Sequence, residues 1–171
     1  ELDCEEPQGG KAVDLRTDCN PVEIESLTFS YFENQDVLKD FSLTVAEGEK
    51  IMIMGESGCG KSTLLKLLLR FYQNTSGKIM LYGHDIDAYP LWQLRQLITY
   101  IPQNSYLFEG SIRENIAFGY AGKGQVRDAE IVRAAKLAYA EEFIDLLPQK
   151  YDTHLDAGGS NLSGGQRQRI A

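Results

Sequence analysis

The sequence contains few cysteines, and their spacing gives no sign of a metal site. Cys4, Cys19 and Cys59 are the only three in 171 residues. No two of them have the close spacing of paired metal ligands. An odd number of cysteines suits a reducing compartment better than a disulfide framework.

Long apolar runs are also lacking. No stretch approaches the roughly 18 apolar residues that a membrane-spanning helix needs, and no secretory signal opens the chain. We therefore expect these 171 residues to be soluble. A membrane domain elsewhere on a longer polypeptide stays open.

Positive charge is in short supply. Seventeen basic residues face 25 acidic ones, for a net charge of −8 and a pI near 4.8. A protein that binds nucleic acid usually presents a basic face, so we expect no DNA or RNA partner. The hydrophobic share of 43% is nevertheless that of an ordinary globular domain with a core.

What the sequence does contain is a phosphate-binding motif. Residues 55–62 read GESGCGKS, which fits the P-loop pattern G-x-x-x-x-G-K-S. The apolar run Lys50–Met54 before it predicts a buried strand, and Thr63–Phe71 after it predicts a helix. A glycine-rich turn could spell the motif by chance, but the flanking strand and helix favour a nucleotide site. Lys61 would reach the β- and γ-phosphates, and the Ser62 hydroxyl would hold Mg²⁺.

The rest of the chain divides into short predicted elements. Residues 1–20 are acidic and broken by proline and glycine, which predicts a linker or tail. Alternating residues predict strands over 22–31 and 37–45 in an antiparallel sheet. Further predicted elements are strands over 78–82 and 97–101, and helices over 90–96, 110–116 and 128–147, the last with Asp128 as its N-cap.

A second motif stands near the C-terminus. Residues 162–166 read LSGGQ. The serine can cap the start of a helix, and the two glycines leave backbone N–H groups open to an anion. Alone, this is an ordinary glycine-rich beginning of a helix as readily as a binding site.

Together, the P-loop and LSGGQ resemble the nucleotide-binding domain of ATP-binding cassette (ABC) transporters, with LSGGQ as the ABC signature. The resemblance covers nearly the whole chain. It implies an α/β fold: a P-loop NTPase (RecA-like) core with an antiparallel β subdomain and an α-helical signature subdomain. We expect a linker from a membrane domain at 1–20 and the nucleotide-binding domain at 21–171. Within it, 21–102 would hold the β subdomain and P-loop core, and 103–171 the Q-loop and helical subdomain.

The resemblance also implies roles for single residues. Tyr31 falls where the family's A-loop aromatic stacks on adenine. Gln103 matches the Q-loop glutamine, which contacts Mg²⁺ and water, so Ser62 and Gln103 are the implied metal-site residues and Lys61 and Gln103 the catalytic ones. The implied ATP-binding residues are Tyr31, Gly55, Glu56, Ser57, Gly58, Cys59, Gly60, Lys61, Ser62 and Thr63. The implied signature residues, for ATP on an opposite subunit, are Leu162, Ser163, Gly164, Gly165 and Gln166.

Residues 103–116 and the linker ending in Glu5-Glu6-Pro7 look like the exporter branch of the family. Exporters carry an X-loop, T-x-V-G-E-x-G, before the signature. Here Asp156 and Ala157 replace its first glycine and its glutamate. In exporters this loop contacts the coupling helix of the membrane domain, so the two replacements change the residues that would make that contact.

The implied partners are ATP with Mg²⁺, a second nucleotide-binding domain in a head-to-tail dimer, and the transmembrane domain of the same transporter. The implied location is the cytoplasmic face of the plasma (inner) membrane. The alternative is a nucleotide-dependent binding module that switches a partner without transport, as soluble ABC proteins do. A P-loop kinase or GTPase is a more distant one, because neither uses LSGGQ.

The family's Walker B strand, with its catalytic glutamate, follows the signature helix, beyond Ala171. We therefore expect a fold that lacks this strand, with its gap filled by a neighbouring chain or open to aggregation. We also expect negligible ATP hydrolysis by residues 1–171 alone. His84 and His154 precede the signature, so neither is the family's switch histidine, and both are predicted to be solvated loop residues.

Overall fold

The computed structural model describes residues 11–32, 35–120 and 126–171. It divides into two compact units, with the boundary between Thr99 and Tyr100. The expected linker residues 1–10, with Cys4 and Glu5–Pro7, lie outside the described residues. Each unit has its own core and is described by itself.

The first unit contains an antiparallel sheet in the order β2-β1-β3-β4. Its strands are β1 (Val22–Ser30), β2 (Asp36–Val45), β3 (Ser76–Leu81) and β4 (His84–Asp85). Val22 pairs with Val45 on one side and with Leu81 on the other. The strands predicted over 22–31, 37–45 and 78–82 are thereby confirmed.

β1 departs from strict alternation at one point. Ile24, Leu27 and Phe29 are its buried residues, so the first step along the strand is three residues and the next is two. The register shifts between Ile24 and Leu27, where Ser26 has a φ of 46°. This irregularity returns the apolar side chains to the core face, because an extra residue reverses the alternation.

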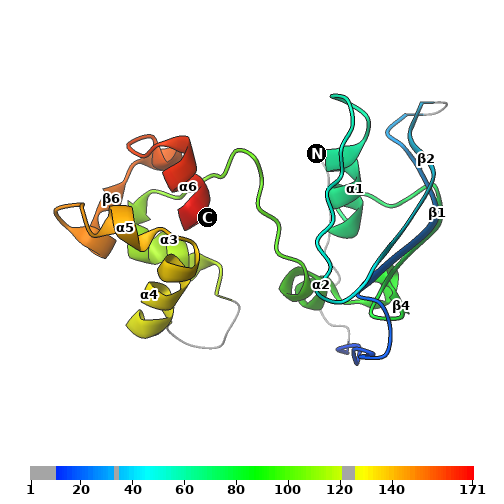
Figure 1. Ribbon diagram of the computed structural model, residues 1–171, viewed down its shortest axis with the longest axis horizontal. Helices are drawn as coiled ribbons and strands as arrows, with labels where there is room; N and C mark the ends of the chain where they lie inside the picture. Colours follow the sequence, from blue (N-terminus) through cyan, green and yellow to red (C-terminus); the bar gives the residue numbers. More distant parts are fainter. Residues whose placement is uncertain (1–10, 33–34, 121–125) are drawn as a thin grey trace. The chain divides into compact units, whose positions relative to one another are not determined.

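Helix α1 (Lys61–Leu68) lies along one face of this sheet (Figure 1). Its Leu64 and Leu67 are buried in one cluster with side chains of β1, β2 and β3. The 3₁₀ helix η1 (Ile86–Ala88) and helix α2 (Leu91–Leu97) complete the unit. The helix predicted after the P-loop is confirmed. The helix predicted over 90–96 is also present, but it begins at Leu91, so that Pro90 is its N-cap and not its first helical residue.

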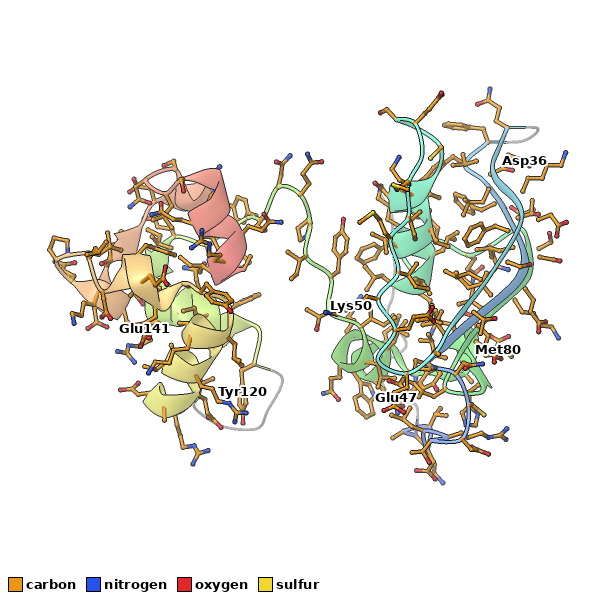
Figure 2. All side chains as sticks on the ribbon, in the orientation of Figure 1. Asp36, Glu47, Lys50, Met80, Tyr120 and Glu141 are labelled. Carbon is orange, nitrogen blue, oxygen red and sulfur yellow. The ribbon has the colours of Figure 1, made fainter. Side chains whose placement is uncertain are left out.

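Two predicted strands are wrong. Residues 50–54 and 98–101 have no regular secondary structure, and α2 extends to Leu97. The trace from Lys50 to the P-loop is drawn as coil (Figure 2). Met52 and Met54 are about four-fifths exposed, and Ile101 is more than half exposed. A strand exists only when a neighbour accepts and donates its backbone hydrogen bonds, and within the described residues neither segment pairs with one.

The described part of the predicted linker, residues 11–20, is attached to the first unit. The Val13 N–H donates to Gln93 Oε1 at 2.8 Å, and Gln93 Nε2 donates to the Val13 carbonyl at 2.7 Å. Gln93 is buried in α2, and the Val13 side chain packs against the core. A single amide side chain thus holds this segment by both backbone groups of one residue.

The second unit is mainly helical around a two-stranded ribbon. The ribbon pairs β5 (Gly110–Ser111) with β6 (His154–Leu155) in antiparallel fashion. The helices are α3 (Ile112–Phe118), α4 (Asp128–Leu137), α5 (Glu141–Ile144) and α6 (Gly164–Ile170), with 3₁₀ helices η2 (Lys150–Asp152) and η3 (Ala157–Gly159). Its buried cluster is Leu107, Ile112, Ala135, Ala140, Ile144, Leu155, Leu162 and Ile170.

The helix predicted over 128–147 is broken into α4 and α5. Tyr139 takes a left-handed φ of 55°, and the Ala140 N–H donates back to the Ala135 carbonyl at 2.8 Å. This turn buries Ala140 and Ile144 in the second core, so packing overrides the helical pattern. The N-cap is Arg127, and Asp128 is the first helical residue.

Short strands account for two further departures from the sequence-based expectations. The helix predicted over 110–116 begins only at Ile112, because Gly110 and Ser111 pair with β6. The two histidines lie on short strands instead of loops, His84 on β4 and His154 on β6, although His154 is exposed as predicted. Among the described residues, no helix has the length and hydropathy needed to cross a bilayer.

Candidate functional site

The P-loop turns on two glycines in left-handed backbone conformations. Gly58 has a φ of 87° and Gly60 a φ of 96°, a region that favours glycine because it carries no Cβ. Gly60 is the N-cap of α1 and its carbonyl accepts the Leu64 N–H at 2.9 Å. In this described loop no side chain caps α1 and no acidic residue stands in its first turn. The positive end of the helix is therefore left to an anion.

The surroundings of Gly60 also leave no room for a side chain. A Cβ at this position would lie 2.9 Å from Leu38 Cδ2 and 3.0 Å from the Val37 carbonyl oxygen. The loop thus passes directly over the first residues of β2. Glycine is needed here for close approach as well as for its φ.

Lys61 lies across the loop. Its Nζ donates to the carbonyl oxygens of Gly55 and Glu56, both at 2.7 Å, and lies 3.4 Å from Cys59 Sγ. The first two partners are backbone carbonyl oxygens, which carry no formal charge. The ammonium therefore brings a net positive charge to the same place that the α1 N-terminus makes electropositive.

Tyr31 and Thr63 meet beside this loop. Tyr31 directly follows β1, and its hydroxyl is 3.1 Å from Oγ1 of Thr63, the third residue of α1. Thr63 is buried, whereas the preceding Ser62 is exposed. The structure therefore brings Tyr31, predicted as an adenine-stacking residue, against the helix that begins at the predicted phosphate site.

The LSGGQ segment begins α6 in the second unit. Ser163 is the N-cap: its Oγ accepts the Gln166 N–H at 3.3 Å, and its own N–H donates to Gln166 Oε1 at 2.9 Å. This is a capping box, so the predicted helix-capping role of the serine is confirmed. Leu162 is buried and anchors the segment in the second core.

The two glycines of the signature are not required by their own unit. Gly164 and Gly165 are exposed, and neither has a left-handed φ. A Cβ on Gly164 would come no closer than 3.9 Å to Arg167 Nη2, and one on Gly165 would meet nothing within 4 Å. The described surroundings would accommodate a side chain at both positions.

Gln103 and the X-loop residues also lie in the second unit. Gln103 is exposed in the irregular segment before β5. Asp156 and Ala157 are exposed, and the following Gly158 N–H donates to the Leu107 carbonyl at 2.9 Å. The two residues that depart from the exporter pattern therefore face outward from the loop.

Sequence reasoning missed two residues beside the site. Tyr72 contacts the Tyr31 ring with a centroid separation of 5.1 Å, and Val37 limits the space at Gly60. No local pattern could have found either, because both act through contacts between segments distant in the sequence.

Comparisons with known proteins agree with the motifs. The family model described as "ABC transporter" matches residues 38–171. The whole chain is 46% identical to an ATP-dependent lipid A-core flippase of Acinetobacter baylyi and covers 29% of its length. Over 151 residues, 88% of the chain, it is 42% identical to a putative multidrug export ATP-binding/permease protein of Staphylococcus aureus, covering 26% of that protein.

The solved structures include a bacterial Atm1-family ABC exporter with ATP bound. It matches 95% of this chain with a TM-score of 0.85 and 37% identity, and the match covers 28% of that exporter chain. The likeness shows the ABC ATPase fold, with its P-loop core and mixed helix and antiparallel sheet. The chain thus spans between a quarter and a third of the length of these three relatives.

Proposed function

The chain belongs to the ABC transporter family, and we propose that it is the ATP-binding part of an exporter that couples ATP binding and hydrolysis to transport across a membrane. The observation that carries the proposal is the N-terminus of α1. There a glycine loop, an uncapped helix end and the Lys61 ammonium converge on a place for a polyphosphate.

On this proposal, each P-loop residue has a physical task. The loop N–H groups and the α1 N-terminus hold the phosphates, and Lys61 exchanges its carbonyl partners for the β- and γ-phosphates. The Ser62 hydroxyl, exposed in the first turn of α1, is an oxygen ligand of the kind that Mg²⁺ prefers. Magnesium, when bound, offsets the negative charge of the phosphates. Gln103 is the proposed second residue of that site.

The signature glycines support a dimer in which each subunit completes the other's site. Gly164 and Gly165 have no steric neighbour in their own unit that requires glycine. Their lack of side chains is explained if the ATP bound to a second copy approaches the Ser163-capped helix end. We propose that ATP joins two such domains head to tail.

The names of the relatives favour an exporter over a soluble switch. A lipid flippase and a multidrug export protein match at more than 40% identity. We propose that this chain acts with a transmembrane domain of the same transporter, at the cytoplasmic face of the inner membrane. The transported substrate is chosen by that membrane domain.

Binding of a fluorescent ATP analogue, with and without Mg²⁺, tests the proposal. We expect saturable binding that Lys61→Ala and Tyr31→Ala both abolish or strongly weaken. Lys78→Ala, which removes an exposed lysine from β3, is the matched control and should bind as the unaltered chain does. Binding that survives Lys61→Ala would contradict the proposed site.

Hydrolysis is a separate test. Phosphoryl transfer requires a group that orients the attacking water, and we expect residues 1–171 alone to turn over ATP negligibly. If this chain turns over ATP and Lys61→Ala abolishes the turnover, the prediction about hydrolysis is wrong. The proposed binding site is not contradicted by that result.

A further inference from the structure

The hydroxyl groups of Tyr31 and Thr63 form a link between two segments that the sequence separates by 32 residues. Their oxygens are 3.1 Å apart. Thr63 is only 6% exposed, whereas Tyr31 is 38% exposed. A buried hydroxyl without a partner is costly, so the tyrosine satisfies a group that water reaches poorly.

The Tyr31 ring is held by two further contacts. Phe29 lies 4.8 Å from it, centroid to centroid, with an interplanar angle of 85°, and Tyr72 lies 5.1 Å from it at 90°. Both are edge-to-face arrangements, which aromatic pairs favour. Tyr72 is placed in turn by Phe29, at 5.7 Å, and by the Lys66 ammonium, 5.9 Å from its ring centroid.

We propose that Thr63 is a positioning residue for Tyr31, which fixes the aromatic ring relative to the phosphate-binding loop. Thr63 directly follows Ser62, so a bond from its side chain places the ring in register with the loop. The inference rests on the proposed function, in which Tyr31 stacks on adenine. Base recognition and phosphate recognition then belong to one rigid unit, and ATP does not have to order the tyrosine on binding.

Two tasks are open to Thr63, and they differ in which ligands feel its loss. A threonine in the first turn of a phosphate-binding helix can also contact the phosphates directly. In that case its loss weakens any polyphosphate. If Thr63 acts through Tyr31, its loss weakens only ligands that carry a base.

The experiment compares two probes, ATP and inorganic tripolyphosphate, by calorimetry or by displacement of a fluorescent nucleotide from the chain. Thr63→Val replaces the hydroxyl by a methyl group and keeps the branched shape. We expect it to weaken ATP about three- to tenfold, the range of one neutral hydrogen bond, and to change tripolyphosphate less than about twofold on the same scale. Thr63→Ser, which keeps the hydroxyl, should restore ATP affinity.

Tyr31→Phe removes the other partner and keeps the ring, so it tests the link even if Thr63→Val folds poorly. It should weaken ATP as much as Thr63→Val does, and the double variant should be no weaker than either single one. Equal weakening of ATP and tripolyphosphate, or additive effects of the two substitutions, would overturn the inference. Failure of the proposed function looks different. In that case the unaltered chain would not bind ATP, or the Lys61→Ala variant would bind ATP as tightly as the unaltered chain does.

Discussion

Replacing Gly60 by alanine tests why the phosphate-binding loop needs glycine at its last turn. The new Cβ would stand in a left-handed conformation with a φ of 96°. It would also lie 3.0 Å from the Val37 carbonyl oxygen and 2.9 Å from Leu38 Cδ2. The leucine end can rotate away, but the backbone carbonyl belongs to β2 and moves only with the strand.

Gly58→Ala is the matched control, because it separates backbone strain from crowding. Gly58 has a similar φ of 87°, yet a Cβ there would meet nothing within 4 Å. Left-handed strain alone costs about 1–2 kcal/mol. Overpacking against fixed neighbours adds about 1–3 kcal/mol. We therefore expect Gly60→Ala to destabilise the fold by about 2–5 kcal/mol and Gly58→Ala by about 1–2 kcal/mol.

Thermal unfolding measures the difference. For a chain of this length each kcal/mol corresponds to about 2–4 °C in Tm. Gly60→Ala should therefore lower Tm by roughly 4–20 °C and Gly58→Ala by roughly 2–8 °C. Gly60→Ala should also weaken ATP binding, because the loop must lift from β2 to make room. Equal losses of Tm in the two variants would refute the role assigned to Val37 and Leu38.

Three further predictions concern features outside the loop. The Ser111 N–H and hydroxyl donate to Glu114 at 2.7 and 2.9 Å and lower the pKa of that carboxyl below its ordinary 4.5. A carboxyl whose pKa is lower in the folded chain stabilises the fold above the unfolded pKa, and this stabilisation is lost as the pH falls through the folded pKa. Glu114→Gln should therefore flatten the loss of stability below pH 4.5. Gln93→Ala should speed hydrogen exchange of the Val13 amide by on the order of tenfold, because both bonds that hold Val13 are lost. Tyr139→Asn should stabilise the chain by about 0.5–1 kcal/mol in denaturant unfolding, because asparagine tolerates the left-handed φ of 55° that an exposed tyrosine adopts there.

Each of these has a control in the chain. Glu142→Gln removes an exposed carboxyl on α5, Gln96→Ala shortens an exposed amide on α2, and Tyr106→Asn replaces an exposed tyrosine whose φ is not left-handed. An acid response changed as much by Glu142→Gln, or faster Val13 exchange in Gln96→Ala, would show that the contacts named above are not the cause. If Tyr106→Asn also stabilises the chain, the left-handed φ of Tyr139 is not the cause of the stabilisation by Tyr139→Asn.

Elements that depend on neighbouring residues follow from the sequence, whereas elements that depend on distant partners do not. The helix after the P-loop and the Ser163 cap were predicted correctly, because each depends on residues within one or two turns. The strand predicted at Lys50–Met54 was wrong, although its apolar run is clear, because the pattern says nothing about the partner that must pair with it. The single helix predicted from Asp128 to Leu147 was wrong for a related reason. The helix breaks at Tyr139 because the turn there buries Ala140 in the second core.

The sequence by itself determined the chemistry of this chain: two motifs whose glycines, lysine and serine are spaced for phosphate, on segments that fold locally into helix beginnings. Only the tertiary structure decided how those motifs are held. It placed Val37 and Leu38 under Gly60, joined Tyr31 to Thr63, tied Val13 to Gln93, and left residues 50–54 unpaired within the described sheet. A loop's backbone preferences are set by its own residues, whereas a buried hydroxyl, a strand edge or a close approach is satisfied by residues far along the chain.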